Sequence, residues 1–193
     1  TNSGTISADD DFGIYNTGVI TTLTNSGTIS AADDYAIYNS NTITTLTNTG
    51  TLSSGFGSID VYNSSATITT FNNDQGKVDS DYIEWNDTLP VNYNIIINST
   101  SDYGITNFSS PSGELDFGIH STSSAKVNTT YVDVLMGLTS SNIDTSSGTI
   151  TIDGTSYAWN LFNTNGSNWA LSIGGSLDTS TKLSLTTEVA PTL

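Results

Sequence analysis

The heptapeptide TNSGTIS occupies residues 1–7 and returns unchanged at residues 24–30. A third copy, TNTGTLS, follows at residues 47–53, so the interval is 23 residues each time. Residues 1–23 and 24–46 are identical at 17 of 23 positions, and residues 47–71 keep the pattern with two extra residues. A repeat of this length is typical of a solenoid, in which each repeat forms one coil that packs on its neighbours.

The residues inside the repeat indicate which kind of solenoid to expect. A leucine-rich repeat has a similar period but places another leucine two positions after Leu23, where this chain has Asn25. Good helix formers are scarce and β-branched residues are common, which favours strands. We therefore predict an all-β fold: a right-handed parallel β-helix with three short strands per coil, near 5–8, 12–15 and 19–24.

Coils stacked about 4.8 Å apart place equivalent residues directly above one another. The apolar columns expected to point inward are Ile6, Ile29, Leu52 and Val78; Phe12, Tyr35 and Ile59; Ile14, Ile37 and Val61; Ile20, Ile43 and Ile68; and Leu23, Leu46 and Phe71. Tyr15, Tyr38 and Tyr62 have the opposite parity, so we expect them to stack on the outside.

Polar residues also form columns, and we expect these at turns. The asparagine columns are Asn2, Asn25, Asn48 and Asn72, and Asn16, Asn39 and Asn63. Asparagine tolerates left-handed backbone geometry, and its amide can bond to the copies above and below it. Gly4, Gly27 and Gly50 are expected at corners with positive φ. The residues predicted to matter most for the fold are Asn25, Gly27, Ile29, Ile37, Ile43, Leu46 and, near the C-terminus, Trp169.

The period ends after Phe71, which divides the chain into four parts. We assign residues 1–78 to regular coils, the last of them degenerate, and residues 79–92, which contain the first proline, to a transition. Residues 93–173 read as short strands separated by turns and form a less regular β cap. Residues 174–193 are a Gly/Ser/Thr-rich tail. Because the chain begins inside a repeat, we expect it to be an excerpt of a longer precursor.

The C-terminal part resembles a known family of secreted proteins. The matching residues are Tyr93-Asn94, Tyr103-Gly104, Phe117-Gly118-Ile119, TYVDVLMGL at 130–138, Ser147-Gly148-Thr149, Tyr157, Leu161 and NWALSI at 168–173. In this order they resemble the end of an autotransporter (type V secretion) passenger, without the membrane barrel that follows it. The resemblance implies β-helix coils closed by an autochaperone-like segment and a place at the bacterial cell surface.

Composition excludes several classes of partner. The chain has 19 acidic residues against three lysines and no arginine, a formal charge of −16. Nucleic acids and anionic lipids need a basic surface, so neither is an expected partner. The chain has no cysteine, hence no disulfide or thiolate metal site. Its apolar runs are far shorter than the roughly 20 residues of a membrane helix, so we expect no membrane insertion by this segment.

Two acidic clusters are candidate sites. Asp10 and Asp11 are expected to lie over Asp33 and Asp34 in the next coil, and stacked carboxylates are candidate calcium ligands. A solvated loop is the simpler explanation, because the third coil has no aspartate at this position. The second cluster, in the transition, consists of Asp79, Asp81, Glu84 and Asp87. Paired carboxylates can hydrolyse a glycosidic bond, so the alternative function is a carbohydrate-active β-helix enzyme.

Other residues give little support to chemistry. His120 is the only histidine, so no histidine-based triad and no two-histidine metal site can form within the chain. Trp85, Trp159 and Trp169 could line a sugar platform, but tryptophans more often fill a core. We therefore expect no enzyme and no required cofactor.

The sequence as a whole favours a non-enzymatic, extracellular structural or adhesive solenoid. Its expected partner is a component of a cell surface or matrix, or further copies of itself. Self-assembly into surface fibres is expected as an option because the ends of a solenoid are unpaired sheet edges.

Overall fold

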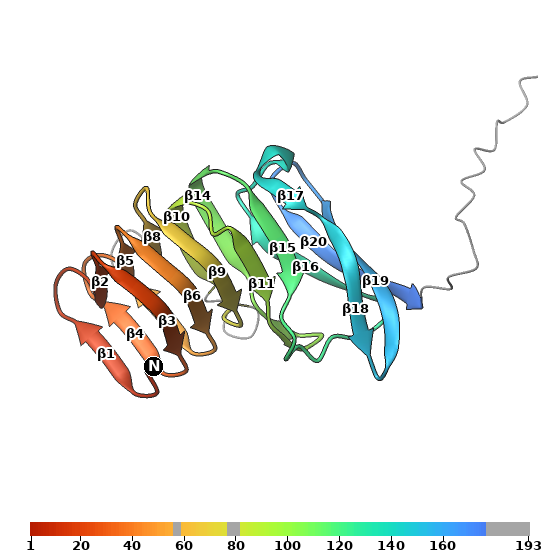
Figure 1. Ribbon diagram of the computed structural model, residues 1–193, viewed down its shortest axis with the longest axis horizontal. Coiled ribbons are helices and arrows are strands. Elements are labelled where there is room, and N and C mark those ends of the chain that lie inside the picture. The colour runs from red at the N-terminus through yellow and green to blue at the C-terminus, as the bar shows by residue number, and fades with distance from the viewer. Residues whose placement is uncertain (56–58, 77–81, 177–193) are drawn as a thin grey trace, which may run out of the picture.

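The computed structural model describes residues 1–55, 59–76 and 82–176, and these residues form a β-solenoid (Figure 1). The strands are β1 (Thr5–Ala8), β2 (Ile14–Asn16), β3 (Val19–Asn25), β4 (Thr28–Ala31), β5 (Ile37–Asn39), β6 (Thr42–Asn48), β7 (Thr51–Ser54), β8 (Val61–Asn63), β9 (Thr67–Asn73), β10 (Ile83–Thr88), β11 (Asn92–Ile95), β12 (Ile97–Ser99), β13 (Asp102–Tyr103), β14 (Thr106–Ser112), β15 (Leu115–Ile119), β16 (Thr129–Met136), β17 (Ile143–Thr145), β18 (Ser147–Ile152), β19 (Thr155–Asn163) and β20 (Trp169–Ser176). A short 3₁₀ turn, η1 (Ser140–Asn142), precedes β17.

The three sequence repeats form three coils, each with three strands. β1, β4 and β7 make one parallel sheet, while β2, β5 and β8 start a second and β3, β6 and β9 a third. Equivalent residues pair directly: Ile6 with Ile29, and Ile29 with Leu52. The predicted parallel β-solenoid with three strands per coil is confirmed, and the coils stack along the long axis of the molecule (Figure 1).

The core of these coils consists of apolar columns. Ile29, Ile37, Ile43 and Leu46 have no exposed surface, as the alternation within the repeat predicted. Full burial of such a side chain contributes roughly 1.5–3 kcal/mol. Identical coils therefore repeat the same favourable contacts at every rung.

One predicted column is wrong. Phe12 and Tyr35 are only half-buried, and their rings pack against the outer Tyr15 and Tyr38 rather than inside the coil. The inner place is taken by the next residue, Ala36, which is fully buried. The prediction extended the strand back to residue 12, whereas β2 and β5 begin two residues later, and the alternation of a strand does not apply before its start. Val78, predicted in another column, lies outside the described residues.

Parallel stacking continues well past the last recognisable repeat. β10 pairs with β8 on one side and β14 on the other, and β11 likewise joins β9 to β15. β16 and β17 extend the two sheets by one more parallel strand each. The segments assigned to the transition and the start of the cap therefore belong to further coils of the same solenoid.

The inner columns change from aliphatic to aromatic along this extension. Val61 pairs with Trp85, which pairs with Phe108. In the neighbouring sheet Phe71 pairs with Tyr93, which pairs with Phe117. Rings in adjacent columns touch, with centroids 5.0 Å apart for Phe71 and Trp85. Larger rings therefore fill the interior of the later coils, beyond β7, where the β1–β4–β7 sheet ends among the described residues.

The C-terminal end of the solenoid is closed by antiparallel strands. β20 pairs antiparallel with β16, β19 pairs with β20, and β18 pairs with β19. This three-stranded C-terminal cap covers the right-hand end of the coils (Figure 1). Trp159 on β19 is buried, and the centroid of its ring lies 5.7 Å from that of Phe117, at the end of the inner aromatic column. The cap therefore covers the end of the hydrophobic core of the coils.

Candidate functional site

Two buried asparagine ladders run along the coils. In the first, Asn2 Nδ2 donates to Asn25 Oδ1 at 2.8 Å, and Asn25 Nδ2 donates to Asn48 Oδ1 at 2.9 Å. In the second, Asn16 donates to Asn39 at 2.7 Å and Asn39 to Asn63 at 2.8 Å. Fully buried amides need such partners, because an unpaired polar group in a core is costly. The predicted amide bonding between copies is confirmed.

The predicted left-handed geometry of these corners is wrong. Positive φ angles in the described residues occur elsewhere, and neither the ladder asparagines nor Gly4, Gly27 and Gly50 have them. Glycine is required for a different reason, which is close approach between coils. A Cβ on Gly27 would lie 2.0 Å from Gly4 O, and one on Gly50 would lie 2.1 Å from Gly27 O.

The first ladder ends at Gln75, which the sequence did not reveal. Asn48 pairs with Asn73 and not with the predicted Asn72, because the two extra residues of the third repeat shift the register. Asn48 Nδ2 instead donates to Gln75 Oε1 at 3.0 Å. The same Gln75 amide accepts from Leu52 N at 2.7 Å and donates to Leu52 O at 2.9 Å. The glutamine side chain therefore bonds to the β7 backbone through both its acceptor and its donor.

The calcium candidates lie on stacked loops of the first two coils. Asp33 N donates to Asp10 O at 3.4 Å, so the loops are superposed as predicted. The side chains of Asp10, Asp11 and Asp33 are exposed, and that of Asp34 is half-buried. Within residues 1–55, 59–76 and 82–176, no three acidic or histidine side chains gather in a way that could hold a metal ion.

Of the second acidic cluster, Asp79 and Asp81 lie outside the described residues. Glu84 and Asp87, on β10, both bond to neighbouring rungs. Glu84 accepts from Asn107 Nδ2 at 2.9 Å, and burial raises the pKa of its carboxyl. Asp87 accepts from Ser65 N at 3.1 Å and from Ser112 Oγ at 3.3 Å. These contacts join neighbouring coils and give both carboxylates a structural role.

The tryptophans are core residues rather than a sugar platform. Trp85, Trp159 and Trp169 are all buried. The indole N–H of Trp169 donates to Leu138 O at 2.9 Å, and that of Trp85 to Thr88 O at 3.0 Å. His120 is half-buried in a turn, where its Nδ1 lies 2.8 Å from Thr122 Oγ1.

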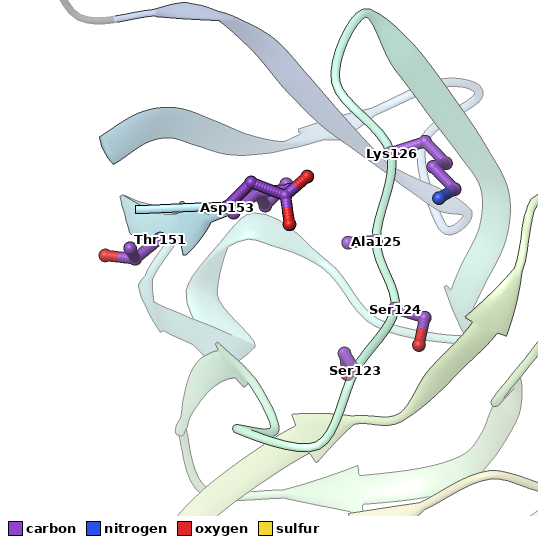
Figure 2. Close-up of a pocket in the computed structure, with 7 residues that line it drawn as sticks. Ser123, Ser124, Ala125, Lys126, Thr151 and Asp153 are labelled. Carbon is purple, nitrogen blue, oxygen red and sulfur yellow. The ribbon is translucent and has the colours of Figure 1, made fainter. Parts of the chain in front are cut away.

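A small pocket of about 280 Å³ lies between residues 123–126 and the tip of the β18–β19 hairpin (Figure 2). Its lining is mostly polar, and Figure 2 shows the Asp153 carboxylate projecting toward Ala125 while the Lys126 side chain points away. The ionisable residues of the lining are Asp153 and Lys126, and their side chains do not point toward each other (Figure 2). The pocket has room for a small polar molecule.

The most distinctive surface is a row of aromatic rings outside β2, β5 and β8, which we name the aromatic stripe: Phe12, Tyr15, Tyr35, Tyr38 and Tyr62. The predicted outer column forms its axis, with ring centroids 5.1 Å apart between Tyr15 and Tyr38 and 5.3 Å between Tyr38 and Tyr62. Burial and the nearby Asp34 carboxylate raise the pKa of Tyr35. Sequence reasoning found three of the five rings. It missed the other two because it placed them in the core.

Comparison of the chain with models of known protein families, with curated protein sequences and with solved structures finds no match. In the part of the chain that the structure describes, no helix is long and apolar enough to cross a membrane.

Proposed function

We propose that this chain is a non-enzymatic structural or adhesive solenoid at the bacterial cell surface, the C-terminal part of a secreted passenger of the autotransporter type. The observation that carries the proposal is the continuous pairing of coil on coil, reinforced by buried amide ladders, in a chain without cysteine.

Such a rod suits an exposed location for physical reasons. The inner strands of the two long sheets are paired on both sides, so local opening that would admit a protease must break several backbone bonds at once. Most of the stability comes from contacts between neighbouring coils, which allows length to grow without a larger core. Low charge density and many hydroxyl and amide groups leave a polar, hydrogen-bonding exterior.

The C-terminal cap supports the resemblance to a passenger. A parallel coil has no partner until another coil is present, so the first coil must close its loop before stacking offsets the entropy. The antiparallel β18–β19–β20 sheet needs only short connections and has its own buried aromatic residues. We propose that the cap folds first and offers β16 and β17 as the edges on which the coils assemble.

The test is to locate the protein on its own cells. Antibodies raised against the chain are applied to intact and permeabilised cells, with and without brief proteinase K treatment, and adherence is compared with that of a deletion strain. We expect labelling of intact cells, a protected rod-sized fragment and reduced adherence after deletion. Labelling only after permeabilisation would contradict the proposal, as would hydrolysis of a polysaccharide that is lost with Glu84→Gln.

A further inference from the structure

The rings of the aromatic stripe pack against one another on the outside of the first three coils. The ring centroid of Phe12 lies 5.3 Å from that of Tyr15 and 4.9 Å from that of Tyr38, so the first two coils form one continuous aromatic surface. Tyr35 extends this surface to Tyr62 at 5.0 Å. Tyr15, with 58% of its surface exposed, is among the most exposed large hydrophobic residues that the structure describes.

Acidic residues border this stripe on its loop side. Asp9, Asp10 and Asp11 immediately precede Phe12, and Asp33 and Asp34 precede the ring of the next coil. All but Asp34 are exposed, and burial together with the Asp34 carboxylate raises the pKa of the Tyr35 phenol. The surface thus combines ring faces and edges with several carboxylates on a chain of net charge −16.

The combination of aromatic rings and carboxylates matches one chemistry in particular. A guanidinium group stacks on aromatic faces and also pairs with carboxylates through its planar N–H groups. An ammonium group pairs with carboxylates more readily than it stacks on aromatic rings, since it is compact and strongly hydrated. The rings touch one another, which leaves no cage for an isolated cation, so a ligand must lie along the outside.

We propose that the aromatic stripe and its acidic border bind an extended, arginine-containing segment of a cationic partner protein. The proposal rests on the adhesive function proposed above and names the partner class. An extended segment advances about 3.3 Å per residue, so four to six residues containing two arginines cover the rungs from Tyr15 to Tyr62.

Charge argues against a second copy as the occupant. Two stripes facing each other would bring two acidic borders together, and like charges across an interface oppose association. A neutral glycan could stack on the rings and donate hydroxyl hydrogen bonds to Asp10 and Asp33, but it would gain no charge attraction from them. The arginine-containing segment is the occupant that stacks on the rings and also complements the negative charge of the border.

The test is direct binding to the intact chain by isothermal titration calorimetry in low salt, with three probes: octa-arginine, octa-lysine and cellohexaose. We expect octa-arginine to bind at least threefold more tightly than octa-lysine, and cellohexaose not to bind. Raising the salt from 50 to 500 mM weakens the binding because it screens the carboxylates.

Matched variants separate the stripe from general charge. Tyr15→Ala removes an exposed ring and should weaken the affinity for octa-arginine at least fivefold. Phe162→Ala removes an exposed ring on the cap and should change that affinity less than twofold. Asp10→Asn with Asp33→Asn should weaken both peptides about fivefold. Asp144→Asn with Asp153→Asn makes the same charge change at two exposed residues, one on β17 and one at the turn of the β18–β19 hairpin, and should change the affinity for both peptides less than twofold.

Several outcomes would overturn the proposal. For the peptides, these are absence of octa-arginine binding, an equal loss of affinity in the two double variants, or unchanged affinity in Tyr15→Ala. For other occupants, they are binding of cellohexaose or dimerisation of the chain, in either case dependent on Tyr15. Circular dichroism of each variant checks that the fold is retained. The measurement does not depend on cellular location, so it can fail while surface labelling succeeds, and the reverse.

Discussion

Asn25 occupies the centre of the first amide ladder, and changing it to aspartate tests that ladder without leaving a cavity. Its Nδ2 donates to Asn48 Oδ1 at 2.9 Å, to Thr51 O at 3.0 Å and to Gly27 O at 3.2 Å. Its Oδ1 accepts from Asn2 Nδ2 at 2.8 Å. Asn25→Asp keeps the size and the acceptor but replaces the donor with a second oxygen, which then faces three acceptors.

The expected cost follows from burial. Asn25 has no exposed surface, so the new carboxylate is a buried charge without a cationic partner. An uncompensated buried charge costs about 3–5 kcal/mol. Asn41→Asp is the matched control, because Asn41 is exposed and its amide makes one bond, to Thr17 O at 3.0 Å. Surface changes of this kind stay within about 0.5 kcal/mol, and both variants add one negative charge.

Urea denaturation followed by tryptophan fluorescence measures the free energy of unfolding of the wild type and both variants at pH 7 and pH 5. Burial raises the folded-state pKa of the introduced carboxyl above its unfolded value, so the penalty is full above the folded pKa and fades as the pH falls through it. The loss in free energy of unfolding that Asn25→Asp causes relative to the wild type should therefore be smaller at pH 5 than at pH 7. The loss caused by Asn41→Asp should not change in this way. If the two variants are equally stable at pH 7, the ladder does not hold the coils together.

Three further predictions concern the core, alkaline pH and calcium. Ile37→Asn should cost about 2–5 kcal/mol and Tyr38→Asn clearly less, because the first places an amide in an apolar column and the second changes an outer ring; chemical denaturation that ranks them the other way would reverse our inward and outward assignment. Burial raises the pKa of Tyr93 to about 12, so the chain should lose up to about 3 kcal/mol of stability as the unfolded state deprotonates between pH 10 and 12. In an alkaline denaturation series Tyr93→Phe should lose less over this range, and an identical slope would refute the assignment. Thermal melting in EDTA and in millimolar calcium should differ by only a few degrees. A large calcium-dependent rise that Asp10→Asn with Asp33→Asn abolishes would make calcium a structural cofactor.

The coils were predictable because the chain repeats its own sequence. Identical residues at a fixed interval must occupy identical environments, so pairing Ile29 with Ile6 needed no knowledge of other proteins. The inward positions followed from alternation inside each strand, and they failed only where Phe12 precedes the strand. The amide ladder was likewise visible as a column before any bond was known.

Features without repetition were not predictable. Gln75 leaves no pattern in the sequence, because it is the one glutamine in the chain and its bonds to the β7 backbone are not part of the repeat. The continuation through β10 and β11 was also hidden, since parallel pairing uses backbone groups that any sequence provides. The sequence predicted only part of the aromatic stripe, because Phe12 and Tyr35 are aromatic residues that could equally belong to a hydrophobic core.

Refolding of two fragments cut between coils shows whether the coils assemble on a cap that folds first. Residues 82–193 contain the cap with β10 to β20, and residues 1–76 contain the three repeats. Far-ultraviolet circular dichroism should show 82–193 refolding alone to a cooperative β-rich state, while 1–76 stays unfolded or refolds slowly. Trp169→Ala, which removes the bond to Leu138 O, should slow refolding of the whole chain. Ready folding of 1–76 beside a disordered 82–193 would contradict the account.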